Sequence, residues 1–207
     1  MPDLTGESAP ASTGSVSERF VETLATRLSL GDVRPRPSQA RQAAVAVVLH
    51  HAPTPRVLLM KRAERIGDPW SGHISLPGGG FHASDGDLRV TAIRESREEL
   101  GIELAGARLL GNLPTLHPRS SGGPKQVEVT PFVFVTDVAL EPVCGPEALA
   151  AFWLPLSLAA SGAIDSTYHI PAPQGPGTLQ FPSWIFEGHV IWGLTRRILD
   201  DLLASGR

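Results

Sequence analysis

The sequence predicts an α/β protein in which a mixed β-sheet is packed between helices. Three observations carry this prediction. Short runs of small, β-branched and aromatic residues recur along the chain. Between them lie segments whose apolar residues follow the spacing of amphipathic helices. Glycine and proline separate many of these runs, so that strands and helices succeed one another as in a layered fold.

The N-terminal part is expected to form a tail, a helix and a linker. Residues 1–14 are rich in Ser, Pro, Gly and Thr and have little to bury, which is typical of a disordered tail. In residues 15–38, apolar side chains recur at four-residue spacing ahead of two prolines: Phe20, Leu24 and Leu28, then Pro35 and Pro37. This pattern predicts a short amphipathic helix followed by an extended linker. Residues 39–207 would then form one domain, because a chain of 207 residues suits a single substantial core.

Strands and helices alternate along this domain. Strands are expected at residues 43–49, 57–60, 73–76, 108–113, 127–136 and 151–154, and a last one at 184–186. Helices are expected at residues 88–100 and at about 191–204, with a helical turn near Leu158. Gly101 is well placed as the C-terminal cap of the first of these helices. The glycine-rich residues 77–80 are expected to form a loop that leads toward it.

Composition narrows the class of partner and the compartment. The formal net charge of −3 shows no basic excess, which disfavours a general nucleic-acid binder and favours a small-molecule substrate. Cys144 is the single cysteine, so an internal disulfide cannot form, and the sequence indicates no zinc site. No apolar run approaches the roughly 20 residues needed to span a bilayer. The N-terminus lacks the pattern of a signal peptide, so we expect a cytoplasmic protein without a membrane partner.

Three carboxylates are expected to share one side of the helix at residues 88–100. Glu95, Glu98 and Glu99 are three or four residues apart or adjacent, which brings them together on a helix surface. Like charges held together favour a cation among them, and oxygen-only ligation suits Mg²⁺ or Mn²⁺. Arg94 lies four residues before Glu98 and can orient its carboxylate. The alternative is a solvated face of Arg–Glu pairs, but the glycine loop just before the helix favours a site for metal and phosphate.

This segment resembles the Nudix box, Gly-x5-Glu-x7-Arg-Glu-U-x-Glu-Glu-x-Gly-U, where U is a bulky aliphatic residue. Residues 94–102 match its second half at every fixed position except Ser96, which replaces an aliphatic residue. Counted from Gly79, Asp85 takes the upstream acidic position, and one extra residue then separates it from Arg94.

The resemblance implies an α/β/α sandwich and a metal-dependent hydrolase that cleaves a nucleoside diphosphate linked to another group. The metal, Mg²⁺ or Mn²⁺, would be held by Glu95, Glu98 and Glu99, with Asp85 as a further ligand. Glu98 or Glu99 would also polarise the attacking water, and the ligand set leaves open which of the two acts. A nearby second motif resembles the family's downstream Glu and Trp-x-Pro-Leu: Glu147, then Trp153, Leu154, Pro155 and Leu156. Glu147 is therefore a further catalytic candidate, with a plain surface glutamate as the alternative.

Other motifs resemble the coenzyme A pyrophosphatase branch of the family. They are Leu58 to Arg62, Gly72 to Gly79, and Ile191 to Thr195. Leu76 stands where that branch usually has Phe, and the stretch between Arg62 and Gly72 is one residue longer. The branch cleaves coenzyme A to 3′,5′-ADP and 4′-phosphopantetheine, which implies coenzyme A or an acyl-coenzyme A as substrate here. The substrate-binding candidates are Arg62, Arg65, Gly78 and Gly79, since arginine binds phosphate bidentately.

The sequence leaves two alternatives open. The same site could take ADP-ribose, dinucleotide polyphosphates or oxidised nucleoside triphosphates. A nucleotide-binding regulatory domain without catalysis is the other alternative, and it is less well supported because all three helix carboxylates are present. The resemblance also implies a homodimer, although nothing in the sequence identifies an interface.

Overall fold

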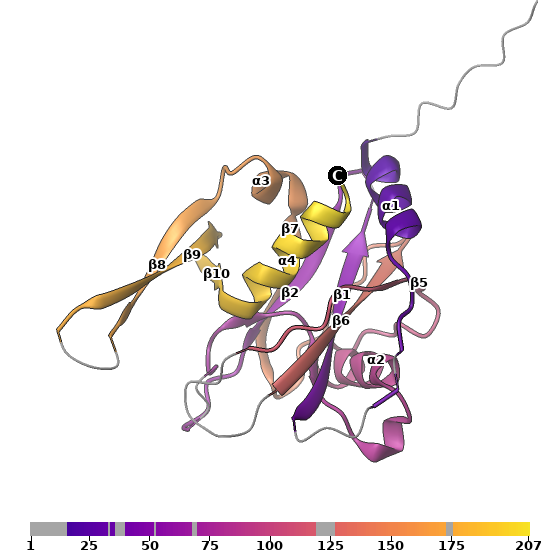
Figure 1. Cartoon of the computed structure of the whole chain (residues 1–207), viewed down its shortest axis with the longest axis horizontal. Coiled ribbons are helices and arrows are strands. Elements are labelled where there is room, and N and C mark those ends of the chain that lie inside the picture. Colours follow the sequence, from indigo (N-terminus) through magenta and orange to yellow (C-terminus); the bar gives the residue numbers. More distant parts are fainter. Residues whose placement is uncertain are drawn as a thin grey trace, which may run out of the picture.

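The computed structural model describes residues 16–32, 34–35, 40–51, 53–67, 70–118, 127–172 and 176–207. The expected tail at residues 1–14 lies outside the described residues. In chain order (Figure 1), the elements are α1 (Val16–Arg27), β1 (Arg41–His50), β2 (Arg56–Arg62), β3 (Ile74–Ser75), β4 (Gly78–Gly80), the 3-10 turn η1 (Ala83–Asp85), α2 (Leu88–Leu100), β5 (Arg108–Asn112), β6 (Val127–Thr136), β7 (Ala148–Pro155), α3 (Leu156–Ala160), β8 (Asp165–Pro171), β9 (Thr178–Phe186), β10 (His189–Trp192) and α4 (Gly193–Ser205).

The main sheet is mixed, as predicted. Its path runs β3-β2-β1-β6-β5, with β7 paired to β2 and β4 paired to β1. β1 and β6 are parallel along their whole length, from Arg41 opposite Val127 to His50 opposite Thr136, and the other pairs are antiparallel. Both faces of these central strands are buried, which explains why each reads as a continuous apolar run in the sequence.

Helices cover both faces of this sheet (Figure 1), so the expected sandwich is confirmed. On one face, α2 packs on alternate residues of β1 and β2, among them Ala46, Val48 and Leu58. On the other face, α1 and α4 pack on the residues between, such as Val47 and Leu49. The Arg27 guanidinium donates to the last carbonyls of α4, which joins α1 to the end of the chain. In the described parts of the chain, no helix combines the length and hydrophobicity needed to cross a bilayer.

A second sheet, β10-β9-β8, differs from the prediction. Residues 184–186 were expected to be the last strand, with a helix from about residue 191. Instead, β9 turns back at Glu187 and Gly188, and β10 precedes α4, which begins only at Gly193. Glu187 and Gly188 both have positive φ, 50° and 78°, as in the tight turn that favours a β-hairpin. β8 was not expected, because its alternating exposure gives no continuous apolar run.

The predicted glycine loop is also wrong in part, because Gly78 to Gly80 form β4 and pair with β1. Gly78 has φ 152°, and a Cβ there would contact the Ala44 carbonyl and the Val45 backbone. The strand is therefore held close to β1 in a way that only glycine allows.

Replacing Gly78 with alanine is expected to lower the free energy of unfolding by about 3 kcal/mol, because the new methyl group meets backbone atoms that cannot move aside. Chemical denaturation followed by circular dichroism measures this. Gly106→Ala is the matched control, since its Cβ would enter open space at an ordinary φ. Equal stability of the two variants would contradict the close approach of β4 to β1.

Candidate active site

Helix α2 has the predicted bounds, and its ends are fixed by local interactions. The Asp87 carboxylate accepts a hydrogen bond from Val90 N at 2.9 Å and caps the N-terminus. At the other end Gly101, in the left-handed conformation with φ 62°, donates to the Arg97 carbonyl. Ser96 is buried where an aliphatic residue was expected, and its hydroxyl donates to the Ala92 carbonyl at 2.7 Å. No unsatisfied polar group therefore results from this substitution.

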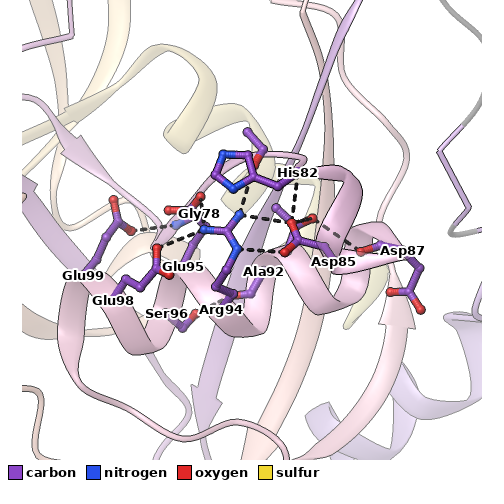
Figure 2. A network of polar contacts seen from close by, with 12 residues as sticks. Gly78, His82, Asp85, Asp87, Ala92, Arg94, Glu95, Ser96, Glu98 and Glu99 are labelled. Carbon is purple, nitrogen blue, oxygen red and sulfur yellow. Dashed lines mark hydrogen bonds and ion pairs between the residues drawn. The ribbon is translucent and has the colours of Figure 1, made fainter.

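Arg94 is the centre of a network of polar contacts, which Figure 2 shows. Its Nε and Nη2 donate to the two carboxylate oxygens of Asp85 at 2.8 and 3.1 Å. Its Nη1 donates to both Glu95 and Glu98 at 2.9 Å. Nη2 also reaches the Gly80 carbonyl at 3.1 Å. One guanidinium thus joins α2, β4 and η1 and fixes the positions of two carboxylates of the cluster.

Asp85 is buried, and both of its oxygens are engaged. Besides Arg94, its carboxylate accepts hydrogen bonds from the Thr91 hydroxyl at 2.8 Å and the His82 amide at 3.0 Å. The side-chain hydrogen bonds from Arg94, helped by those from His82 and Thr91, hold the pKa of Asp85 well below its ordinary range although burial opposes this. The contact with Asp85 in turn raises the pKa of Arg94. The expectation that Asp85 ligates a metal does not fit this geometry, in which its oxygens bind the guanidinium.

Glu99 is the most buried carboxylate of the cluster, with 2% of its surface exposed. Its Oε2 accepts a hydrogen bond from Gly78 N at 2.8 Å, so the helix carboxylate contacts β4 directly. Burial raises the pKa of Glu99 to about 8, against the opposing effects of the Gly78 hydrogen bond and the Arg62 charge. Burial likewise raises the pKa of Glu95. A negative charge is therefore costly at both positions in the absence of a cation.

Glu98 on α2 and Gly79 on β4 complete the cluster. The Glu98 side chain is 55% exposed, and Arg94 Nη1 donates to its carboxylate. A Cβ on Gly79 would come within 2.5 Å of Glu95 Oε1. Gly79 therefore leaves room for the Glu95 carboxylate, a second reason for glycine beside that found at Gly78.

We expect Gly79→Ala to impair activity more than stability. The added methyl group would displace the end of the Glu95 side chain, whereas the Gly79 backbone does not need a positive φ. Turnover should fall by about 10- to 100-fold, as when a group that orients a metal ligand is lost. Steady-state kinetics and thermal unfolding of Gly79→Ala and Gly78→Ala, measured side by side, distinguish the two effects. If Gly79→Ala lost thermal stability to the same extent as Gly78→Ala, without a larger loss of turnover, this prediction would be contradicted.

Comparison with known proteins places this arrangement in a family. The sequence model of the NUDIX domain matches residues 40–172, more than half of the chain. The chain belongs to the NUDIX family. The chain is 31% identical over 163 residues to an uncharacterised Nudix hydrolase, NudL, of Photorhabdus laumondii, covering 78% of this chain and 83% of the relative. A NudL of Yersinia pestis is 32% identical over 163 residues, covering 78% of each chain.

Two solved structures support the fold. A NUDIX hydrolase from Alicyclobacillus acidocaldarius superposes with a TM-score of 0.54 at 20% identity, covering 83% of this chain and 95% of the other. A MutT/nudix family protein from Enterococcus faecalis gives a TM-score of 0.53 at 15% identity, covering 93% and 74%. At these identities the likeness concerns the fold alone.

In this NUDIX domain, the predicted site residues outside α2 lie around the same cluster. Arg62 ends β2, and its positive charge lowers the pKa of Glu99. The Glu147 charge raises the pKa of both Glu95 and Glu99, so it also faces the cluster. Arg65 and Glu147 form an ion pair of 3.3 Å with both side chains about half exposed. That pairing was not predicted, because 82 residues separate the partners and no local pattern links them.

The donor set of the NUDIX domain fits a hard divalent cation. Across the described residues, no three acidic, histidine or cysteine side chains already surround one point at ligand distance. The chemistry is nevertheless suitable, because Glu99 is buried, Glu95 is partly buried, and the Glu95 charge raises the pKa of Glu99. A divalent cation would offset the cost of ionising these carboxylates, and Glu98 could join through Oε1 while its Oε2 accepts the hydrogen bond from Arg94.

Proposed function

We propose that this chain is a metal-dependent pyrophosphohydrolase that cleaves coenzyme A or an acyl-coenzyme A. The products would be 3′,5′-ADP and 4′-phosphopantetheine or its acyl derivative. One observation carries the hydrolase proposal: the buried Glu99 carboxylate is held against the Gly78 amide, next to Glu95 and Glu98. The site thereby combines carboxylates that can bind a cation with a glycine backbone that phosphate oxygens can approach.

The roles follow from the positions of the side chains. Glu95, Glu98 and Glu99 would hold Mg²⁺ or Mn²⁺, which when bound neutralises pyrophosphate oxygens and lowers the pKa of a water. Glu98 or Glu99 would accept the proton of the attacking water. Arg94 fixes Glu95 and Glu98 through its Nη1, and Asp85 fixes Arg94. Asp85 is thus proposed as a positioning residue in place of a metal ligand.

Residues around the carboxylates would bind the substrate. The backbone of Gly78 and Gly79 would approach the pyrophosphate closely, since glycine has no side chain to keep the phosphate oxygens away. Arg62 and Arg65 would meet the phosphates of the substrate, Arg65 after release from Glu147. Glu147 would then face the cation or its water as a further acidic group.

The coenzyme A assignment is supported by contacts between two motifs, residues 72–79 and 191–195, that are distant in the sequence and both resemble the coenzyme A pyrophosphatase branch. The Thr195 hydroxyl donates to the Ile74 carbonyl at 2.9 Å, and both residues are buried. The His73 ring lies 5.3 Å from that of Trp192. Residues 72–79 and 191–195 therefore contact each other, which is consistent with a shared role in one substrate site.

A substrate panel tests the proposal. Coenzyme A, acetyl-coenzyme A, ADP-ribose, diadenosine polyphosphates and 8-oxo-dGTP are compared by kcat/KM with Mg²⁺ and again with Mn²⁺, and products are identified by mass. We expect the coenzyme A compounds to be preferred and 3′,5′-ADP to be released. Preference for another substrate would keep the metal site and reject the coenzyme A assignment.

A further inference from the structure

The hairpin of β8 and β9 is apolar on one face, while the other face carries polar residues and two prolines. Strand alternation places four apolar residues on the first face: Tyr168, Ile170, Leu179 and Phe181. The opposite face of the same stretch carries six exposed residues: Thr167, His169, Pro171, Thr178, Gln180 and Pro182. None of the four apolar residues belongs to either hydrophobic core of the described residues. The hairpin projects from the body of the molecule (Figure 1), so its apolar face is not explained by packing of the domain.

Ring contacts connect this face to the active site. Trp192 lies 4.7 Å from Tyr168 and 5.4 Å from Phe181 between ring centroids. Trp192 also contacts His73, at 5.3 Å between ring centroids, and the His73 carbonyl accepts a hydrogen bond from Arg62 N at 3.0 Å. A continuous apolar strip therefore leads from the neighbourhood of Arg62 along the hairpin. We call Trp192, Tyr168, Phe181, Ile170 and Leu179 the apolar strip.

We propose that the apolar strip binds the acyl chain of an acyl-coenzyme A and so favours longer thioesters over free coenzyme A. The inference rests on the proposed function and adds a site for the part of the substrate remote from the cleaved bond. The strip contains no acidic or basic residue, and Leu179 at its far end is 42% exposed. It extends along β9 from Ser183, which pairs with Trp192, to Leu179, about 13 Å at the rise of a strand.

A hydrocarbon chain fits this strip better than a protein partner does. A stable protein interface uses roughly 20–30 residues on each side, several times more than the strip offers. A narrow apolar band that begins near Arg62 and leads away from it suits the far end of an acyl-coenzyme A, because the pantetheine arm separates the acyl chain from the pyrophosphate. Covering the strip would remove its aromatic and aliphatic surface from water, and the gain would grow with each methylene added.

The test compares two double variants at neighbouring positions of the hairpin. Ile170→Thr/Leu179→Thr changes a cross-strand pair of the strip, and His169→Thr/Gln180→Thr changes the adjacent pair on the opposite face. For each protein, kcat/KM with Mg²⁺ is measured from coenzyme A through acetyl- to decanoyl-coenzyme A. Binding of the same series is measured by calorimetry in EDTA, where no cleavage is needed for a signal.

We expect wild-type affinity and kcat/KM to rise by about two- to fourfold for each methylene that reaches the strip, and then to level off. The strip variant should lose most of this dependence and keep its activity on free coenzyme A, while the control variant keeps both. A flat response in the wild type, or an unchanged slope in the strip variant, would overturn the inference. If the strip variant instead changes only the sedimentation coefficient, the face binds a second copy of the chain and the acyl site is rejected.

The two proposals fail in different ways. Cleavage of free coenzyme A without chain-length dependence leaves the proposed function intact and rejects the acyl site. Binding in EDTA that strengthens with chain length, without cleavage of any coenzyme A compound, rejects the proposed function and supports the strip.

Discussion

Glu99→Gln is expected to lower kcat by about 100- to 1,000-fold without loss of stability. The amide cannot offer the anionic oxygen that a divalent cation requires, so the charge that positions the cation is lost. Folding should not suffer, because Gln Oε1 can still accept the hydrogen bond from Gly78 N. The substitution also removes a carboxylate whose burial, at 2% exposed, is costly without a cation. Kinetics at fixed Mg²⁺ and chemical denaturation in EDTA measure the two effects.

Glu103→Gln is the matched control for this prediction. Glu103 lies just beyond the end of α2 and is exposed, outside the carboxylate cluster. Its variant should resemble the wild type in both kinetics and stability. If Glu99→Gln lost stability along with activity, Glu99 would serve mainly to hold β4 against α2.

Arg94→Met is expected to lower both stability and activity. Its loss leaves the buried Asp85 carboxylate without its main counter-charge, which should cost about 3 kcal/mol in the free energy of unfolding. Activity should fall by about 10- to 100-fold because Glu95 and Glu98 lose the guanidinium that orients them. Arg97→Met, an exposed change one turn along the same helix, should alter stability by no more than about 0.5 kcal/mol.

A double variant separates the two effects of Arg94. Adding Asp85→Asn to Arg94→Met removes the unpaired buried charge, so we expect at least about 1 kcal/mol of stability to return. Activity should not return, since Glu95 and Glu98 stay without their guanidinium. Strictly additive losses in stability would show that Arg94 and Asp85 act independently, against the geometry of their two hydrogen bonds.

The sequence predicted those features that depend on local signals. The bounds of α2 follow from the polar turn before Leu88 and the glycine after Leu100, and the structure reproduces both. β1 and β6 were also found, because strands buried on both faces are continuously apolar. The sandwich architecture followed from this alternation and from the Nudix resemblance together.

Features that depend on long-range pairing were not predicted. Three consecutive glycines read as a loop, and only pairing with β1 makes Gly78 to Gly80 a strand. The β8–β9 hairpin alternates polar and apolar residues in short segments, and the turn at Glu187 and Gly188 carries a weak signal. In the site, Gly86, with φ 75°, and the cap residue Asp87 connect η1 to α2, and the Asp85 and Arg94 side chains meet across this turn. The Nudix resemblance implied that Asp85 is a metal ligand, whereas its hydrogen bonds to Arg94 are the basis for proposing it as a positioning residue.

The central claim is that the carboxylates of α2 and the glycines of β4 form a centre for metal-dependent pyrophosphate cleavage. The most direct test incubates coenzyme A with wild-type protein and with Glu98→Gln, each with Mg²⁺ and with EDTA, and identifies the products by mass. We predict that 3′,5′-ADP and 4′-phosphopantetheine appear with the wild type and Mg²⁺, and that both EDTA and the substitution abolish them. Nucleotide binding without cleavage of coenzyme A here, or of any compound of the substrate panel with Mg²⁺ or Mn²⁺, would contradict the claim and indicate a regulatory binding domain.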